Sequence, residues 1–495
     1  MAEKYVLSID QSTQGTKALL FDGTGNLVCR ADRNHRQIVS DEGWVSHDLE
    51  EIYLNTIMAV RDVIEKAGIN KNDVQGLGIS NQRETAAVWD RNGKPAADAV
   101  VWQCARSAGI CYAIEKLGKA GIVREKTGIR LSPYFPASKF AWLLPNVSKA
   151  GELNRQGELM FGTIDTWLLY KLTGGKAYKT DYSNASRTQL FHLQTLQWDP
   201  EVCDLFGIRT DQLAEVCDSN SVFGETDFEG YLPSPIPICG VLGDSHGALF
   251  GQGCIRQGMM KATYGTGSSV LLNIGEKPVF SSRGAVTSLA WGIDGTVNYV
   301  LEGNINYTGA VISWLQRDLQ LIGSARETAE LAERANPEDA TYIVPAFTGL
   351  GAPYWYSDAK ALITGMSRLT GKKEIVKAAL ECIAYQIADI VDVMKEEAGI
   401  EIEELRADGG AAGNGYLMQF QSDITEMPVL TPDAEELSGI GAAYMAGLKL
   451  ELYDKTIFEK LNRKQFLPVM DHAIVRQKKK GWHEAVELSV HKSEV

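Results

Sequence analysis

Two aspartates follow apolar stretches and are themselves followed by small polar residues. Asp10 comes after Tyr5–Ile9 and opens the segment DQSTQGTK, and Asp244 comes after Ile238–Leu242 and Gly243. Successive backbone N–H groups in such turns form anion-binding sites, and small side chains let the backbone approach phosphate oxygens closely. A carboxylate beside such a turn suits Mg²⁺ carried in with a nucleotide, because Mg²⁺ keeps most of its waters and takes few carboxylates. The alternative role for Asp10 is to cap the turn.

Two further glycine clusters have a similar composition. Gly265-Thr-Gly267 lies between apolar runs, and Asp408–Gly413 reads DGGAAG. Neither GxxxxGK[ST] nor GxGxxG occurs in the chain. A single glycine-rich turn is also typical of a plain hairpin. Two such turns, each associated with an Asp at the end of a strand, favour a phosphate site over simple connections.

A charged pair, Arg83 and Glu84, follows directly from an apolar run at 74–80. Adjacent residues of a strand point to opposite faces, so only a bend at the end of the strand directs both side chains into one site. The alternative is a solvated pair on the surface.

Strands that alternate with helices position these residues, which is an α/β pattern. We predict a helix opened by Asp48 as N-cap and continuing through Ile64, and a second helix over 374–394. The pattern restarts near Pro237, so we predict two domains, 1–242 and 243–495. The predicted strands are 5–9, 18–21, 27–31, 74–80, 86–89, 238–242, 258–264 and 269–274.

The bulk properties favour a soluble cytoplasmic protein. The 495 residues carry a formal charge of −14, which disfavours binding to nucleic acid or to an anionic membrane. No stretch reaches the roughly 18 uncharged apolar residues of a membrane helix, and the N-terminus does not resemble a signal peptide. The eight cysteines are scattered; reduced thiols are favoured over four disulfides in a large chain of this kind.

Long segments of the chain occur in a recognisable order: IDQSTQGTKALLFD, GISNQRETAAVW, VVWQCARS, YFPASKFAWLLPN, FGTIDTWLLYKLTGG, TDYSNASRT, GDSHGALFGQ, TYGTG, YIVPAFTGLGAPYW and DGGAAGN. In this order they resemble the glycerol kinases, which belong to the FGGY carbohydrate kinases of the actin-like ATPase superfamily. The similarity runs nearly from end to end. It implies two actin-like (ribonuclease H-like) domains, with mixed sheets flanked by helices and an active site in the cleft between the domains.

The resemblance implies ATP and Mg²⁺ as cofactors, with Asp10 orienting the metal ion. Lys17 stands where many relatives have Arg, so the charge is kept but bidentate geometry is lost. Ser313 occupies a position that is often Gln. The implied nucleotide contacts are Thr13, Gln14, Gly15, Lys17, Thr266, Gly309, Ser313, Gly410 and Asn414.

On the substrate side, the resemblance implies a small polyol. Its hydroxyls would be bound by Arg83, Glu84 and Tyr134. Trp102 would lie against its carbon face, with ordinary core packing as the alternative. Asp244 corresponds to the catalytic base that receives the proton of the attacking hydroxyl. The transition state of phosphoryl transfer is loose, so positioning and charge neutralisation carry most of the acceleration.

The function implied is ATP-dependent phosphorylation of glycerol to sn-glycerol 3-phosphate. Two positions depart from the family: Ser245, a substrate contact, is usually Gln, and Ser269 is usually Phe. Both changes make the pocket larger and more polar, so an FGGY kinase for a C4–C5 polyol or ketose, such as erythritol, threitol or a pentulose, is the alternative. A non-catalytic ATP-switched protein is the alternative from another class. The resemblance also implies a homodimer or homotetramer. The net charge and the lack of a long apolar stretch predict no nucleic acid partner and no membrane insertion.

Overall fold

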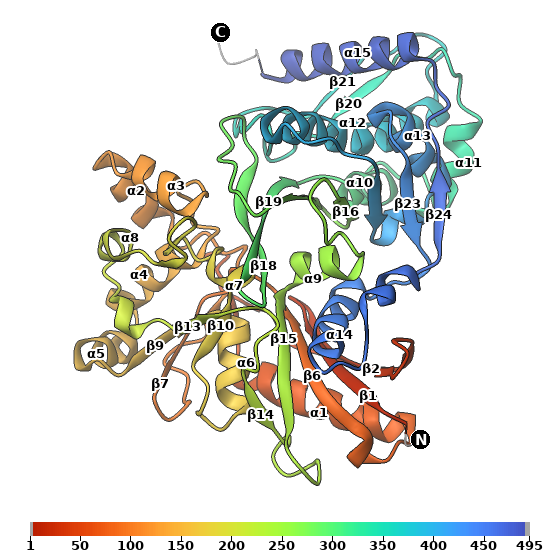
Figure 1. Ribbon diagram of the computed structural model, residues 1–495. Coiled ribbons are helices and arrows are strands. Elements are labelled where there is room, and N and C mark those ends of the chain that lie inside the picture. The colour runs from red at the N-terminus through yellow and green to blue at the C-terminus, as the bar shows by residue number, and fades with distance from the viewer. Residues whose placement is uncertain (1–2, 491–495) are drawn as a thin grey trace.

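The computed structural model describes residues 3–490, which fold into two halves, each built around a mixed β-sheet (Figure 1). The first sheet has the strand order β14-β15-β6-β1-β2-β3, and the second has the order β18-β19-β17-β16-β22-β23-β24. The strands of the first sheet are β1 (Tyr5–Gln11), β2 (Gly15–Asp22), β3 (Leu27–Asn34), β6 (Val74–Asn81), β14 (Gly224–Thr226) and β15 (Ile236–Gly243). Those of the second are β16 (Met260–Tyr264), β17 (Ser268–Gly275), β18 (Val286–Ile293), β19 (Thr296–Ile305), β22 (Leu405–Asp408), β23 (Val429–Pro432) and β24 (Arg463–Phe466).

The two sheets share one spatial order and direction of strands over five strands. In the first, β1 pairs antiparallel with β2, which pairs antiparallel with β3, while β6 and β15 continue the sheet in parallel on the other side. In the second, β16, β17 and β19 lie side by side in the same antiparallel order, and β22 and β23 continue the sheet in parallel, but the chain passes through the outer strand β18 before it reaches β19. The chain therefore starts a second sheet as predicted, but at β16 and not near Pro237, because β15 pairs with β6 and belongs to the first sheet. The turns at 12–14 and 265–267 join the first hairpin of each sheet and occupy equivalent places.

The predicted strands of the first sheet are confirmed, but the β1–β2 hairpin is longer than expected. Its ladder continues past Asp10, which pairs with Lys17, as far as Gln11 and Thr16. Gln11 and Thr16 are fully buried, so pairing satisfies backbone groups that water cannot reach. The turn itself is short, and the Ser12 N–H donates to the Gly15 carbonyl at 2.8 Å.

Apolar side chains are buried on both faces of the first sheet. On β1, Leu7 and Ile9 belong to a core shared with the helices α1 (Leu49–Ala67) and α6 (Ile164–Leu172), whereas Val6 faces the opposite core. This alternation follows from the period of two of a strand. The predicted N-cap of α1 is confirmed: Asp48 Oδ1 accepts from the Glu50 N–H at 2.8 Å and the Glu51 N–H at 3.3 Å.

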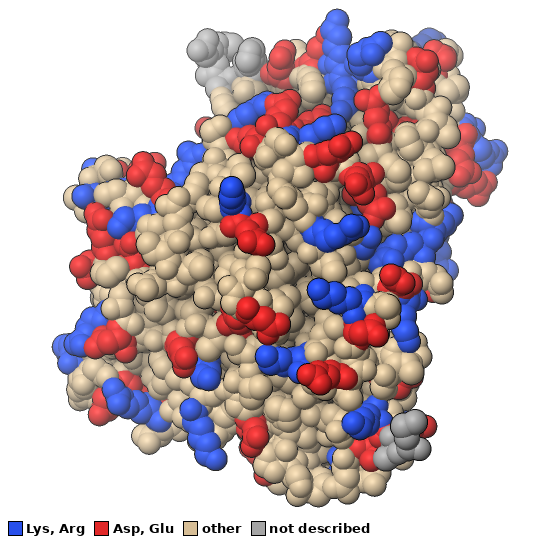
Figure 2. Space-filling model, viewed as in Figure 1, with Lys and Arg blue, Asp and Glu red and all other residues tan. Residues whose placement is uncertain are grey.

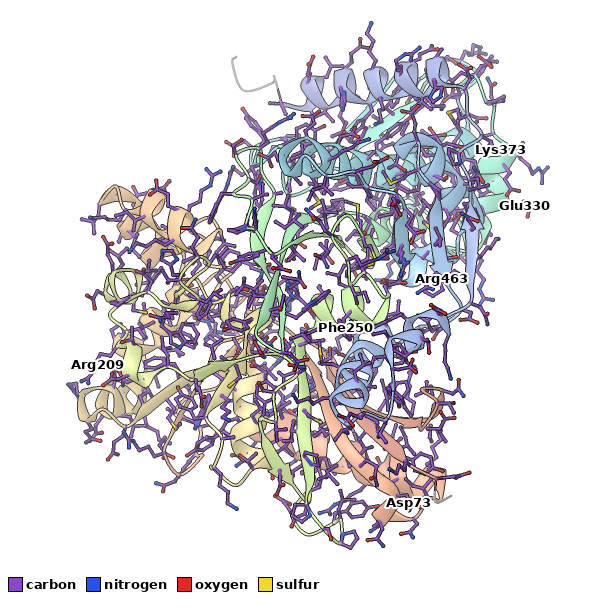
Figure 3. The ribbon with its side chains drawn as sticks, in the orientation of Figure 1. Asp73, Arg209, Phe250, Glu330, Lys373 and Arg463 are labelled. Carbon is purple, nitrogen blue, oxygen red and sulfur yellow. The ribbon has the colours of Figure 1, made fainter. Side chains whose placement is uncertain are left out.

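Two helices, α9 (Asp244–Gly251) and α14 (Leu437–Lys449), form a layer between the two sheets (Figure 1). Phe250 of α9 lies at this junction (Figure 3) and shares a core with residues of both sheets. The helices cross closely, because a Cβ atom at Gly441 would collide with the carbonyl of Gly247. Although α14 comes late in the chain, it packs against β1, β6 and β15 of the first sheet. The division into domains 1–242 and 243–495 stays a prediction.

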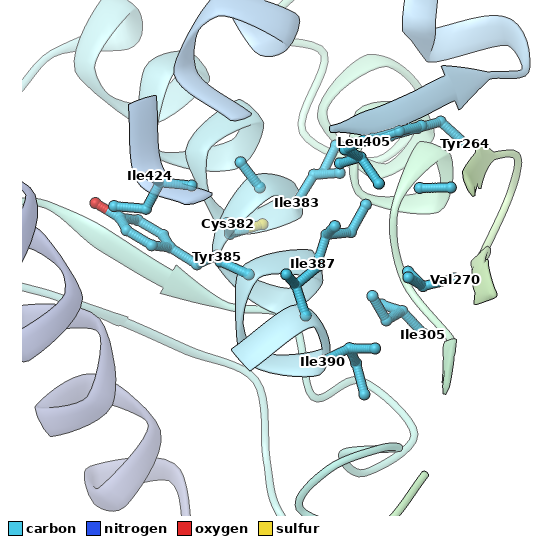
Figure 4. Close-up of a cluster of buried hydrophobic side chains, with 14 of the residues drawn as sticks. Tyr264, Val270, Ile305, Cys382, Ile383, Tyr385, Ile387, Ile390, Leu405 and Ile424 are labelled. Carbon is cyan, nitrogen blue, oxygen red and sulfur yellow. The ribbon is translucent and has the colours of Figure 1, made fainter. Parts of the chain in front are cut away.

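The core of the second half is built on the long helix α12 (Lys372–Ala398), which confirms the helix predicted over 374–394. Its apolar face, including Ile383, Ile387 and Ile390, lies beside Val270 and Ile305 of the sheet (Figure 4). The other helices of this half are α10 (Gly309–Arg317), α11 (Glu327–Glu333), α13 (Gly415–Thr425) and α15 (His472–Val490).

A lobe inserted between β6 and β14 carries short elements (Figure 1). Trp102 and Tyr134 lie in loops of this lobe. Its helices are α2 (Ala108–Lys116), α3 (Ala120–Thr127), α4 (Pro136–Asn146), α5 (Ser148–Gln156), α7 (Tyr182–Ala185) and α8 (Pro200–Leu205). Its strands are β7 (Ala87–Asp90), β8 (Ala99–Val100), β9 (Leu159–Gly162), β10 (Lys179–Asp181), β11 (Phe191–His192), β12 (Gln197–Trp198) and β13 (Glu215–Cys217). The remaining strands are β4 (Ile38–Val39), β5 (Val45–His47), β20 (Tyr342–Val344) and β21 (Leu362–Thr364).

Basic and acidic side chains are interspersed over the face shown in Figure 2. All eight cysteines are free thiols. Within residues 3–490, no helix combines the length and the apolar character that crossing a bilayer requires.

Candidate active site

A cavity of about 630 Å³ lies where the two halves meet. The parallel strands β1, β6 and β15 end in register there, since Asn81 pairs with both Gln11 and Gly243. Groups that follow the carboxyl ends of parallel strands meet at one edge of a sheet. The second half adds the β16–β17 turn and the end of β19. The predicted site residues that line the cavity are Thr13, Arg83, Glu84, Trp102, Tyr134, Asp244, Ser245 and Thr266.

The bend expected after β6 is present. Glu84 has φ of 59°, in the left-handed region, three residues after β6 ends at Asn81. A non-glycine residue adopts this region at a cost, and such residues cluster at functional sites. Arg83 and Glu84 thereby line the same cavity, although both are almost fully buried.

A buried network of four charges fixes this pair. Arg83 donates from Nη1 and Nη2 to the two carboxylate oxygens of Glu302, at 2.8 and 2.9 Å. Arg187 donates from Nε to Glu84 Oε1 at 2.5 Å, and its Nη1 lies 2.9 Å from Glu302 Oε2. Burial alone would raise the pKa of Glu302, but the guanidinium groups of Arg187 and Arg83 hold that pKa well below its usual range. The four charges balance, and two of them, on Arg83 and Glu84, face the cavity.

Asp244 is the first residue of α9, where the helix dipole favours a carboxylate. Its Oδ1 atom accepts from Arg83 Nε at 3.1 Å and from the Ser245 N–H at 2.6 Å. The side chain is 39% exposed and lines the cavity. Arg83 also donates from Nη2 to Ser245 Oγ at 3.1 Å, so Ser245 belongs to the same polar wall.

An aromatic wall closes the other side. Trp102 Nε1 donates to Thr13 Oγ1 at 2.9 Å, and its ring lies 5.5 Å from that of Tyr134. The Tyr134 loop is held from behind by Lys139, whose Nζ donates to the carbonyls of Pro133 (2.7 Å), Phe135 (3.4 Å) and Tyr134 itself. Trp102 is therefore positioned between the turn at 12–14 and Tyr134.

A second cavity of about 220 Å³ adjoins the first, and the two share Asp244, Ser245 and Thr263. It also contains Asp10, Lys17, Lys261, Asp408, Gly409, Glu435 and Glu436. Lys17 Nζ lies 2.7 Å from Glu436 Oε2.

Asp10, the predicted metal ligand, is a buried carboxylate that lines the smaller cavity. It is 7% exposed, and burial raises its pKa to about 6, an effect that Lys17 opposes and Asp244 reinforces. Within the described part of the chain, no group of three or more His, Cys, Asp or Glu side chains is arranged to hold a metal ion. One buried carboxylate beside a phosphate turn fits Mg²⁺ that keeps waters and arrives with phosphates, not a cage made wholly of protein ligands.

The remaining predicted nucleotide residues lie outside the linings of these two cavities. Gly309 begins α10 and packs on the turn that carries Thr266: its N–H donates to the Gly265 carbonyl at 3.0 Å, and a Cβ atom there would lie 2.6 Å from the same oxygen. Asn414 caps α13 by accepting from the Leu417 N–H at 3.0 Å. The others are Gln14, Gly15, Ser313 and Gly410, of which Gly15 alone is buried.

Sequence reasoning missed several charged residues of the site. Glu302 and Lys261 stand alone within the apolar strands β19 and β16, a pattern that signals a buried charge with a special partner. Arg187 lies in the segment TDYSNASRT without any distinguishing neighbour. Only its contacts with Glu84 and Glu302 in the folded protein identify it as part of the charge network.

Comparisons with known proteins show the family and the fold of the chain. The model of the FGGY carbohydrate kinase N-terminal domain matches residues 5–251, and that of the C-terminal domain matches residues 260–450. Glycerol kinase 1 of Thermotoga maritima is 48% identical over 97% of this chain and 99% of its own length. The crystal structure of Plasmodium falciparum glycerol kinase with ADP superposes with a TM-score of 0.94, at 35% identity and 99% coverage of both chains. A ligand-bound xylulose kinase from Lactobacillus acidophilus, with a TM-score of 0.86, 20% identity and 98% and 97% coverage, has the same fold. The chain belongs to the FGGY family of carbohydrate kinases.

Proposed function

We propose that this protein transfers the γ-phosphoryl group of ATP to a terminal hydroxyl of glycerol, which yields ADP and sn-glycerol 3-phosphate. The observation that carries the proposal is one cavity lined by Asp244, the Arg83–Glu84 pair and the Trp102–Tyr134 wall. The full-length similarity to glycerol kinases supports it. A C4–C5 polyol or ketose is not favoured, because these relatives match over the whole chain despite Ser245 and Ser269.

The polar and aromatic walls have complementary tasks. Arg83 and Glu84 offer donors and an acceptor to the polyol hydroxyls, and Trp102 and Tyr134 cover its carbon atoms. The charge network holds Arg83 and Glu84 before substrate arrives, so little reorganisation accompanies binding. Such preorganisation turns binding into orientation of the reacting hydroxyl.

Asp244 has the position of the base. Its Oδ1 atom is fixed by Arg83 and Ser245, so the carboxylate is oriented with its exposed part toward the cavity. The hydroxyl oxygen forms a bond to the γ-phosphorus, the bond from that phosphorus to the β–γ bridging oxygen breaks, and the hydroxyl proton passes to Asp244. The proton leaves late, so Asp244 acts mainly through position.

The nucleotide side rests on Asp10, Lys17 and the turn that carries Thr266. Bound Mg²⁺ would neutralise charge on the β- and γ-phosphates, and Asp10 would hold it. Lys17 is paired with Glu436, so it must exchange that partner for phosphate when ATP binds. A cytoplasmic location and a homodimer or homotetramer stay predictions.

A coupled assay of ADP release, with and without glycerol and then with C3 to C6 polyols, tests the proposal. We expect release to depend on glycerol and to be fastest with it. Release that does not respond to any polyol would instead support a protein that uses ATP as a switch. A higher kcat/KM for a C4 or C5 compound would overturn glycerol as the substrate.

A further inference from the structure

One buried cation of the active-site region has no assigned task. Lys261 lies on β16 and is 1% exposed, yet it lines the smaller cavity together with Asp10 and Asp244. A lysine taken out of water normally pairs with a carboxylate. Lys261 instead donates to two neutral hydroxyls, Thr263 Oγ1 at 2.7 Å and Ser269 Oγ at 3.4 Å, and forms no ion pair with any residue between 3 and 490.

The charges around the cavity make this arrangement unusual. The lining carries five carboxylates and two lysines. Lys17 already has Glu436 at 2.7 Å, and Glu436 also pairs with Arg30. Of the two lysines in this lining, Lys17 therefore forms a short ion pair, and Lys261 forms none in the described part of the chain.

The position of Lys261 coincides with the path of the phosphoryl group. The two cavities meet at Asp244, Ser245 and Thr263, and the hydroxyl that holds Lys261 most closely belongs to Thr263. A group that moves in line from a nucleotide beside Asp10 to a hydroxyl beside Asp244 must cross this junction. Charge spread over the three equatorial oxygens of that group is stabilised by cations fixed in advance.

We propose that Lys261 is a catalytic residue that contacts the transferred phosphoryl group, on ATP and during transfer. The inference rests on the proposed phosphoryl transfer and deepens it. It also gives Ser269 a role. Its hydroxyl helps to hold the ammonium group of Lys261, a task that a phenylalanine cannot perform.

Two substitutions test the proposal against a matched control. Lys261→Met removes the charge with little change in shape, and Lys261→Arg keeps the charge. The control is Lys377→Met. Lys377 is 5% exposed in the same half of the protein and donates to the carbonyls of Asn336 (3.0 Å) and Asp339 (3.3 Å), outside the linings of both cavities.

In the parent background, kcat with glycerol should fall about 10²–10³-fold in Lys261→Met, while the glycerol KM changes less than about threefold. Lys261→Arg should recover much of the loss, and Lys377→Met should keep kcat near that of the parent. Calorimetry with Mg²⁺ supplies a readout that needs no polyol. Lys261→Met should weaken a non-hydrolysable ATP analogue about tenfold or more while the affinity for ADP stays nearly constant.

A kcat within threefold of the parent would overturn the proposal. So would an equal loss of affinity for ADP and the triphosphate analogue, because that pattern indicates a disturbed site and not a lost contact to the γ-phosphoryl group. If Lys261→Met does not fold, a Lys261→Arg variant that folds yet binds the analogue no better than ADP also overturns it. If the parent does not use glycerol, the proposed function fails, and the two nucleotide affinities alone decide the role of Lys261.

Discussion

Replacing Arg187 by methionine should destabilise the protein and weaken polyol binding together. Arg187 is 1% exposed and contacts Glu84 at 2.5 Å and Glu302 at 2.9 Å. Glu302 would keep both hydrogen bonds from Arg83. Among the described residues, Glu84 would keep Arg83 Nε, 3.9 Å away, as its remaining ion-pair partner. The substitution therefore leaves the Glu84 carboxylate buried with its short partner gone.

The expected loss follows from this geometry. Removing one partner of a buried ion pair costs about 3–5 kcal/mol of unfolding free energy. Methionine fills most of the space of the aliphatic stem, so the loss comes from charge and not from a cavity. Glu84 would no longer be held toward the polyol. Loss of one hydrogen bond to a charged group, worth about 1.5–3 kcal/mol, should raise the glycerol KM roughly tenfold or more. The KM for ATP should change little.

Urea unfolding of a double-mutant cycle measures the effect. The cycle contains Arg187→Met, Glu84→Gln and both together. Neutralising Glu84 removes the unpaired charge, so the double variant should be more stable than the sum of the single losses predicts, by about 1 kcal/mol or more. Additive losses, or an Arg187→Met variant within about 1 kcal/mol of the parent, would refute the idea that Arg187 compensates Glu84.

Three further predictions concern single residues. Asp244→Asn should keep ATP affinity in calorimetry but lower turnover about 10²–10⁴-fold. The amide oxygen of asparagine can still accept the hydrogen bonds from Arg83 and Ser245, but the amide cannot take up the hydroxyl proton. Activity within a few-fold of the parent would contradict this role. Asp10→Ala should raise the Mg²⁺ concentration needed for half-maximal activity steeply and leave the glycerol KM nearly unchanged; an unaltered Mg²⁺ dependence would return Asp10 to capping the turn. Burial lowers the pKa of Lys139 from 10.5 to about 7, so between these values the folded state binds fewer protons than the unfolded state and parent stability rises with pH. In urea unfolding at pH 7 and pH 9, the free energy of unfolding should rise less with pH in Lys139→Met than in the parent. An equal rise in both proteins would show that the pKa of Lys139 is not lowered.

The hairpins that carry the phosphate turns were predictable because they are local. Apolar residues flank small ones in the segments 5–22 and 258–274, so the strand–turn–strand pattern depends on residues that are neighbours in the sequence. The bend at Glu84 followed from the same kind of reasoning, since two adjacent charged residues reach one site only if the strand stops between or just before them. The full length of the β1–β2 ladder was not predicted, because the polar residue types of Gln11 and Thr16 give no sign in the sequence that both residues are buried.

The sequence by itself determined five strands of the first sheet, the β16–β17 hairpin, and that Asp10, Arg83 and Asp244 follow apolar strands. The strands β18, β19, β22, β23 and β24 were not predicted. Only the tertiary structure decided which charges meet. Arg83 and Glu302 are 219 positions apart, and periodicity shows that a position is buried without showing which opposite charge lies across from it. The same holds for α14, whose residues are apolar nearly all round. It packs on the first sheet because Gly78 and Gly240 of β6 and β15 leave room for its Ala442 carbonyl, a fit between surfaces that exists only after these strands have come together.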